Sequence, residues 1–71
     1  MKLPRGVQGA DVVRALERLG FSAVRQTGSH VRLVRGSLRV TVPHHESLAP
    51  GTLKSILRQA EIDLETFAKN L

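Results

Sequence analysis

A histidine flanked by arginines is the feature of this sequence best suited to chemistry. His30 follows Gly28 and Ser29, and Arg25, Arg32 and Arg39 lie on either side of it in the chain. A neutral imidazole can take the proton of an RNA 2′-hydroxyl, and guanidinium groups can stabilise the charge that develops when that oxygen attacks the adjacent phosphorus. The pattern therefore nominates His30 as a general base and the arginines as phosphate ligands. A histidine that only hydrogen-bonds a turn, or that contacts phosphate without chemistry, fits the same spacing.

Ser29 is not expected to act as a nucleophile beside His30. Successive side chains of a strand point to opposite faces, so a Ser29–His30 dyad cannot form easily. Gly28 and Ser29 are instead expected to shape a turn, where small residues let the backbone bend or approach a phosphate.

A second pair of histidines, His44 and His45, precedes Glu46. Together with His30 they could nominally supply a His₃ or His₂Glu metal site, but neighbouring histidines rarely point at one ion and the HExxH spacing is absent. We therefore expect neither a metal nor another cofactor. One of the pair is expected near the basic residues, as a second phosphate ligand or a general acid; an exposed and inactive loop histidine is an equal alternative.

A further phosphate contact is possible where a helix is expected to begin. Gly51 and Thr52 fall in its first turn, where unpaired backbone N–H groups favour an anion, and Lys54 lies close by. An ordinary helix start offers the same donors, and this simpler interpretation is favoured.

The overall composition is basic. The 71 residues include 11 Lys and Arg against 6 Asp and Glu, a net charge of +5. Residues 21–45 carry Arg25, Arg32, Arg35 and Arg39 and no acid. Such a patch is typical of a surface that binds nucleic acid, although a solvated arginine-rich surface without a partner is the alternative.

The residue types that are missing exclude several classes of site. Without cysteine there is no disulfide, thiolate nucleophile or cysteine zinc site, and no Trp, no Tyr and only 2 Phe argue against a base-stacking surface. The start, MKLPRGVQG, has no apolar run, and nowhere does the sequence approach a membrane span. We expect a cytoplasmic protein.

Hydrophobic periodicity predicts the order α-β-β-β-α. A helix is expected over 10–19, strands over 21–27, 29–35 and 38–43, a helix over 50–60, and a last short turn that Asp63 caps and that carries Leu64 and Phe67. Gly20 and Phe21 are expected to end the first helix in a Schellman motif, and Ile62 is expected to fold back on the core. A chain this short supports one core, so residues 1–71 are expected to form a single domain.

The strand pattern predicts one apolar and one basic face. Val31 and Leu33 share a face opposite His30 and Arg32, and Arg39 and Thr41 alternate with apolar residues. The first strand cannot be assigned, because Ala23 and Val24 are adjacent. The expected fold is a two-layer α+β domain with a three-stranded antiparallel sheet, like double-stranded-RNA-binding domains, whose core comprises Val12, Leu16, Leu19, Val31, Leu33, Val40, Val42, Leu53, Ile56 and Leu57.

Four segments in this order resemble the HicA (YcfA-like) toxins of HicA/HicB toxin–antitoxin pairs. They are LxxLGF at the end of the first helix, GSH at 28–30, VTVPHH at 40–45 and LAPGTLKSILRQAEI at 48–62. Each segment is weak alone, and the combination over about residues 9–67 is specific.

The resemblance implies a metal-independent endoribonuclease that cleaves mRNA and blocks translation, and that a HicB-like antitoxin neutralises by covering the active face. It places the catalytic histidine at His30 and the family's PxH histidine at His45, and the expected RNA contacts are Gly28, Ser29, Arg25, Arg32, Arg39 and Lys54. Family members often have glycine where this chain has Glu61. Two other functions remain possible: an RNA-binding module without catalysis, and a basic face that only docks an acidic protein.

Overall fold

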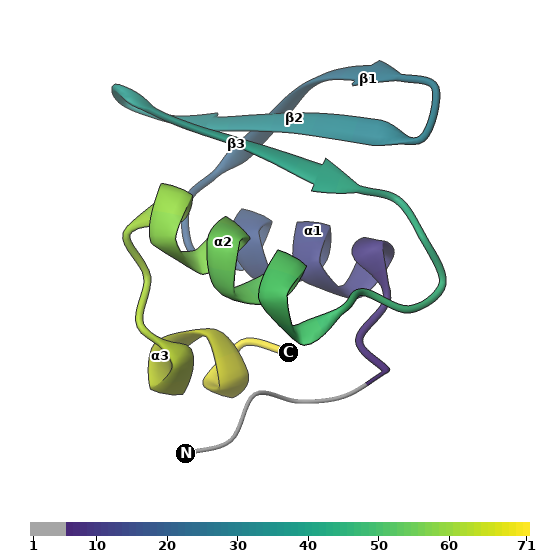
Figure 1. Ribbon diagram of the computed structural model, residues 1–71. Coiled ribbons are helices and arrows are strands. Elements are labelled where there is room, and N and C mark those ends of the chain that lie inside the picture. Colours follow the sequence, from purple (N-terminus) through teal and green to yellow (C-terminus); the bar gives the residue numbers. More distant parts are fainter. Residues whose placement is uncertain (1–5) are drawn as a thin grey trace.

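The computed structural model describes residues 6–71. Its helices and strands follow the predicted order (Figure 1), and the sheet is antiparallel with strand order β1-β2-β3. The α+β fold, in the arrangement of double-stranded-RNA-binding domains, is thus confirmed. The elements are α1 (Gly9–Arg18), β1 (Ser22–Thr27), β2 (His30–Arg35), β3 (Leu38–Pro43), α2 (Pro50–Ala60) and α3 (Leu64–Lys69).

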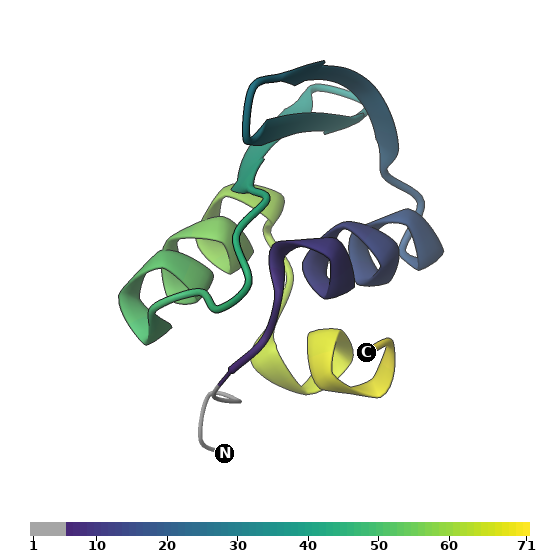
Figure 2. The same cartoon turned by 90° about the vertical axis from the view of Figure 1, so that its right-hand side faces the viewer.

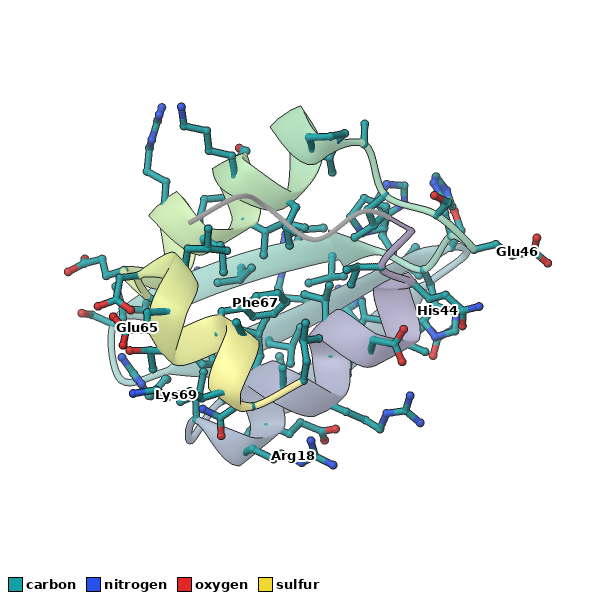
Figure 3. The ribbon with its side chains drawn as sticks, turned by 90° about the horizontal axis from the view of Figure 1, so that it is seen from below. Arg18, His44, Glu46, Glu65, Phe67 and Lys69 are labelled. Carbon is teal, nitrogen blue, oxygen red and sulfur yellow. The ribbon has the colours of Figure 1, made fainter. Side chains whose placement is uncertain are left out.

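The helices lie on one side of the sheet. Figures 1 and 2 show α1 and α2 beneath one sheet face, with α3 beyond them on the side away from the strands. Phe67 of α3 points into the interior between helices and sheet (Figure 3) and is fully buried. The opposite face of the sheet is uncovered. The buried core comprises Val7, Val12, Ala15, Leu16, Phe21, Val31, Leu33, Val40, Val42, Leu48, Leu53, Ile56, Leu57, Ala60 and Phe67.

The first helix ends in the predicted Schellman motif. The Phe21 N–H donates to the Leu16 carbonyl at 3.0 Å, and the Gly20 N–H donates to the Glu17 carbonyl at 3.1 Å. Gly20 adopts φ +97°, a conformation that residues with a Cβ rarely adopt. The chain therefore turns sharply from α1 into β1.

The prediction that Leu19 belongs to the core is wrong. Leu19 is the half-buried C-cap residue of α1, and the chain has already left the helix's apolar stripe there. Phe21 is buried instead, with 3% of its surface exposed. Arg35 stabilises this corner, because its guanidinium donates to the Leu19 carbonyl at 2.8 Å and lies 4.8 Å from the Phe21 ring centroid.

The faces of β2 and β3 are as predicted. Val31, Leu33, Val40 and Val42 are buried against the helices. His30, Arg32, Arg39 and Thr41 are exposed on the other face. The alternation of side chains along these two strands therefore separates the core from the basic face.

A β-bulge explains why β1 has no simple pattern. Ala23 pairs with Leu33 but Arg25 pairs with Arg32, so Val24 is the extra residue and 55% of its surface is exposed. A one-residue shift reverses the face of every later side chain. Arg25 and Thr27 consequently share the basic face with Arg32 and His30.

The C-terminal helices begin and end as their sequence suggests. Pro50 opens α2, and Ile62 folds back against the core. The Asp63 carboxylate accepts a hydrogen bond from the Thr66 N–H at 2.7 Å, and the hydrogen bonds from Thr66 hold the Asp63 pKa below its ordinary value. No helix within residues 6–71 is long and apolar enough to cross a membrane.

Candidate active site and nucleic-acid interface

The uncovered sheet face contains a shallow basic hollow around His30. It has a volume of about 310 Å³ and is lined by Arg25, Thr27, His30, Arg32 and Thr41. Register alone brings these residues together, because Thr27 pairs with His30, Arg25 with Arg32, and Arg32 with Thr41. The hollow therefore combines one titratable ring, two guanidinium groups and two hydroxyl groups.

The bulge at Val24 builds one side of this hollow. In a regular antiparallel pairing that continued from Ala23 and Leu33, Arg25 would lie on the same face as Ala23. The extra residue moves Arg25 and Thr27 to the face that carries His30. Thr27 and Thr41 were not among the residues predicted for the site. The signal for Thr41 was its place between Val40 and Val42, which set it on the basic face.

His45 lies beside His30. The centroids of the two rings are 6.3 Å apart and their planes meet at 67°. Both side chains are exposed, and each imidazole can extend a hydrogen bond of about 3 Å. The two rings can therefore contact different oxygens of one phosphodiester group. Of the two loop histidines, His45 is thus the one that faces His30.

Backbone hydrogen bonds hold the loop that carries His45. The His44 N–H donates to the Ser29 carbonyl, which continues the β2–β3 ladder beyond Pro43. The Gly9 N–H, in the first turn of α1, donates to the His45 carbonyl at 2.8 Å. The loop is therefore attached on one side to the turn before His30 and on the other to α1.

Gly9 is a site residue that sequence reasoning missed. A Cβ at this position would lie 2.2 Å from the Pro43 carbonyl oxygen and 2.8 Å from the His44 Cα. Only glycine lets the start of α1 approach the histidine loop so closely. The available signal was a glycine at the first position of a helix, where it gives no advantage in helix propensity.

No acidic side chain of the described part of the chain forms an ion pair with the charges of this face. Among residues 6–71 the ion pairs are Arg14–Asp11 on α1 and Lys69–Glu65 on α3, both in the helical layer. Arg25 and Arg32 stand directly opposite each other on adjacent strands. Like charges at paired positions destabilise a sheet, so this arrangement favours an anion as a ligand.

The remaining predicted residues are distributed as follows. Gly28 and Ser29 form the turn that leads into His30, with Gly28 at φ +58°. Arg39 lies on the basic face, in a second hollow farther along the strands. Lys54 is exposed on α2, in the helical layer, and lines neither hollow.

The histidine loop does not gather metal ligands. Glu46 points away from the protein at this loop (Figure 3). Within residues 6–71 no three His, Cys, Asp or Glu side chains are placed to hold one ion. The geometry favours two imidazoles that act on a bound anion.

Comparison with known protein families gives a match that covers most of the chain. Residues 9–62 match the family described as HicA toxin of bacterial toxin–antitoxin. The matched span is well over half of the chain, and it includes His30, His45, Gly9 and every residue that lines the basic hollow. A search of curated proteins finds no match.

Proposed function

The chain belongs to the HicA family of bacterial toxin–antitoxin toxins, and we propose that it is a metal-independent endoribonuclease that cuts mRNA and thereby stops translation. The observation that carries the proposal is that His30 lines a hollow with Arg25 and Arg32 and that the ring centroid of His45 lies 6.3 Å from that of His30. A base, an acid and a cationic clamp are the groups that such a reaction needs.

In the proposed reaction His30 removes the proton of a 2′-hydroxyl group. The 2′-oxygen forms a bond to the adjacent phosphorus while the bond from phosphorus to the 5′-oxygen breaks. His45, in its protonated form, gives a proton to the departing 5′-oxygen, which becomes a hydroxyl. The products are a 2′,3′-cyclic phosphate and a free 5′-hydroxyl end. Arg25 and Arg32 stabilise the negative charge that builds on the phosphoryl oxygens.

We propose that the basic face binds both partners of the protein, RNA and an antitoxin. RNA occupies the basic face through phosphate contacts from Arg25, Arg32 and Arg39, and the turn at Gly28 and Ser29 approaches the backbone. A HicB-like antitoxin neutralises the toxin in the cytoplasm by covering this face, and no cofactor is required.

A cleavage assay with purified protein and labelled RNA in EDTA tests the proposal. The parent should cut RNA, leave an all-DNA strand intact and produce 2′,3′-cyclic ends. His30→Ala should lower the rate by about 10²- to 10⁴-fold, the usual loss on removing a general base. His44→Ala is the matched control: it removes a neighbouring exposed imidazole and should leave the rate near that of the parent.

The pH profile assigns the role of His45. Loss of one limb of a bell-shaped profile in His45→Ala makes this residue the general acid. A near-parental rate leaves protonation of the 5′-oxygen to water or to another residue.

Four results would count against this proposal. Tight RNA binding without any cut points to an RNA-binding module, and no RNA affinity even at low salt points to a face that docks an acidic protein. The catalytic scheme is wrong if folded His30→Ala cuts as fast as the parent, or if EDTA abolishes the activity and a divalent metal restores it.

A further inference from the structure

The basic face contains a second hollow that shares a wall with the first. It is lined by Val24, Arg25, Arg32, Val34, Gly36 and Arg39. Arg25 and Arg32 also line the hollow around His30, so this pair stands between the two. The ligand surface therefore continues past the histidines toward the β2–β3 turn.

The two hollows together extend over more than one nucleotide. His30, Arg32 and Val34 lie on one face of β2, and Val34 pairs with Arg39. At about 3.3 Å per residue, the distance along the strand from His30 to Val34 is about 13 Å. A stacked nucleic-acid strand advances about 3.4 Å per nucleotide. A phosphate at His30 therefore leaves room for neighbouring nucleotides at Arg39.

The arginine pair between the hollows has the character of an anion clamp. Arg25 and Arg32 are directly opposite on adjacent strands, and neither forms an ion pair among residues 6–71. This pairing is unfavourable in the free protein and becomes favourable when one anion bridges both side chains. Val24 and Val34 supply apolar surface beside the clamp, and Arg39 supplies a guanidinium plane on which a base can stack.

We propose that Arg25 and Arg32 clamp one phosphate of an unpaired RNA strand, and that the hollow of Val24, Val34, Gly36 and Arg39 binds a nucleotide next to the one at His30. The inference rests on the proposed function in that it takes RNA as the substrate. With Arg25 and Arg32 on the phosphate and Arg39 stacked on the base, the remaining lining of Val24, Val34 and Gly36 has no side-chain group that could hydrogen-bond a base edge. The second hollow therefore binds the RNA backbone and accepts any base.

An unpaired strand fits this face better than a duplex. The three arginines lie one on each strand, with Arg25 opposite Arg32, and with Arg39 opposite Val34, two residues further along β2. They present donors to one phosphodiester backbone that crosses the sheet. Modules that recognise duplex RNA contact two successive minor grooves and the phosphates between them. Attack by a 2′-oxygen in line with the leaving oxygen also needs a nucleotide that is free to rotate out of a helix.

Binding of uncleavable oligonucleotides of increasing length tests the proposal separately from catalysis. Each oligonucleotide carries 2′-deoxy at the attacking nucleotide, and fluorescence anisotropy reports its affinity. For the parent, extending a dinucleotide by two nucleotides on one side should raise the affinity by about tenfold, the value of one charge-assisted phosphate contact. In Arg39→Gln the ratio of long to short affinity should fall toward one. Arg58→Gln, which removes the same charge from exposed α2, should keep the parental ratio.

Thermal melting of the free protein tests the clamp. Arg25→Gln should raise the melting temperature at low salt and weaken oligonucleotide binding, because it removes both the repulsion and one ligand of the phosphate. The proposal is overturned if extending the dinucleotide on either side leaves the affinity unchanged, or if Arg39→Gln keeps the parental ratio of long to short affinity. It is also overturned if a duplex binds more tightly than either single strand, or if Arg25→Gln lowers the melting temperature. If the parent binds longer oligonucleotides more tightly but does not cleave RNA, the proposed ribonuclease function is wrong and the proposed nucleotide subsite stands.

Discussion

Replacing Gly9 with alanine tests whether the start of α1 positions His45. In a helix, alanine is ordinarily more stable than glycine by about 1 kcal/mol. At Gly9 the added methyl would stand 2.2 Å from the Pro43 carbonyl oxygen, whereas real Cβ atoms essentially never approach other heavy atoms within 3.0 Å. Either α1 or the histidine loop must therefore move by about 1 Å.

That displacement falls on the segment that carries His45. The loop is attached to α1 by the hydrogen bond from the Gly9 N–H to the His45 carbonyl, and to the turn before His30 by the bond from His44 to Ser29. A misplacement of about 1 Å can lower a catalytic rate by about 10²-fold. We expect Gly9→Ala to lower kcat by about that factor and to change KM much less, because the arginines that bind phosphate lie on the strands and not on this loop.

Gly51→Ala is the matched control. Gly51 also lies in the first turn of a helix, but a Cβ there meets nothing within 4 Å. This change should raise the melting temperature slightly and leave cleavage unaltered. Circular dichroism of both variants establishes that they are folded before rates are compared.

A double-variant cycle identifies the route of the effect. If Gly9 acts through His45, the rate of Gly9→Ala/His45→Ala should be close to that of His45→Ala alone, because the loss occurs once. Folded Gly9→Ala with the parental kcat and pH profile would refute the positioning argument. The positioning argument would also be refuted if the rate losses of Gly9→Ala and His45→Ala multiply in the double variant.

Further predictions concern stability. Glu61 ends α2 with φ +55°, so Glu61→Gly should stabilise the protein by about 0.5–1 kcal/mol in denaturant titrations, and Glu61→Ala should not. Because hydrogen bonds from Thr66 lower the folded-state pKa of Asp63, its cap stabilises the protein above pH 4 or so and is lost as the pH falls through the folded-state pKa. The melting temperature of Asp63→Ala should therefore lie below that of the parent at pH 7 and meet it at low pH. Leu16→Ala or Ile56→Ala should cost about 2–5 kcal/mol and leave little folded protein at physiological temperature.

The faces of β2 and β3 were predictable because their pattern is local. Val31 and Leu33 alternate with His30 and Arg32, and one face must be buried. The faces of β1 were not predictable from the sequence, because a bulge is a property of two paired strands. Val24 becomes the extra residue only when Ala23 and Arg25 pair with consecutive residues of β2.

The proximity of His30 and His45 had a partial signal in the sequence. The two-residue turn at Gly36 and Ser37 makes Arg35 pair with Leu38, and counting outward along the hairpin places His30 opposite Pro43. The next residues after Pro43 must then begin close to His30. Which of the two histidines turns toward it depends on the contact with Gly9, which lies far away in the sequence and has no local signature.

Salt should affect the folding and the RNA binding of this protein in opposite directions. Arg25 and Arg32 repel each other across the strands, and salt screens interactions between exposed charges. Raising the salt from low to physiological concentration should therefore increase the melting temperature of the parent. The increase should be smaller in Arg25→Gln, whereas Arg58→Gln, which removes an equal charge from α2, should behave like the parent.

RNA affinity should fall over the same range, because each phosphate that an arginine neutralises releases about 0.7 of a counterion from a single strand. The slope of log affinity against log salt should accordingly be less steep in Arg25→Gln than in Arg58→Gln. If the two variants show equal salt dependence in both measurements, the charge of the sheet face has no special role, and net charge alone accounts for RNA binding. Unequal effects in both would tie the instability of the free face to its affinity for phosphate.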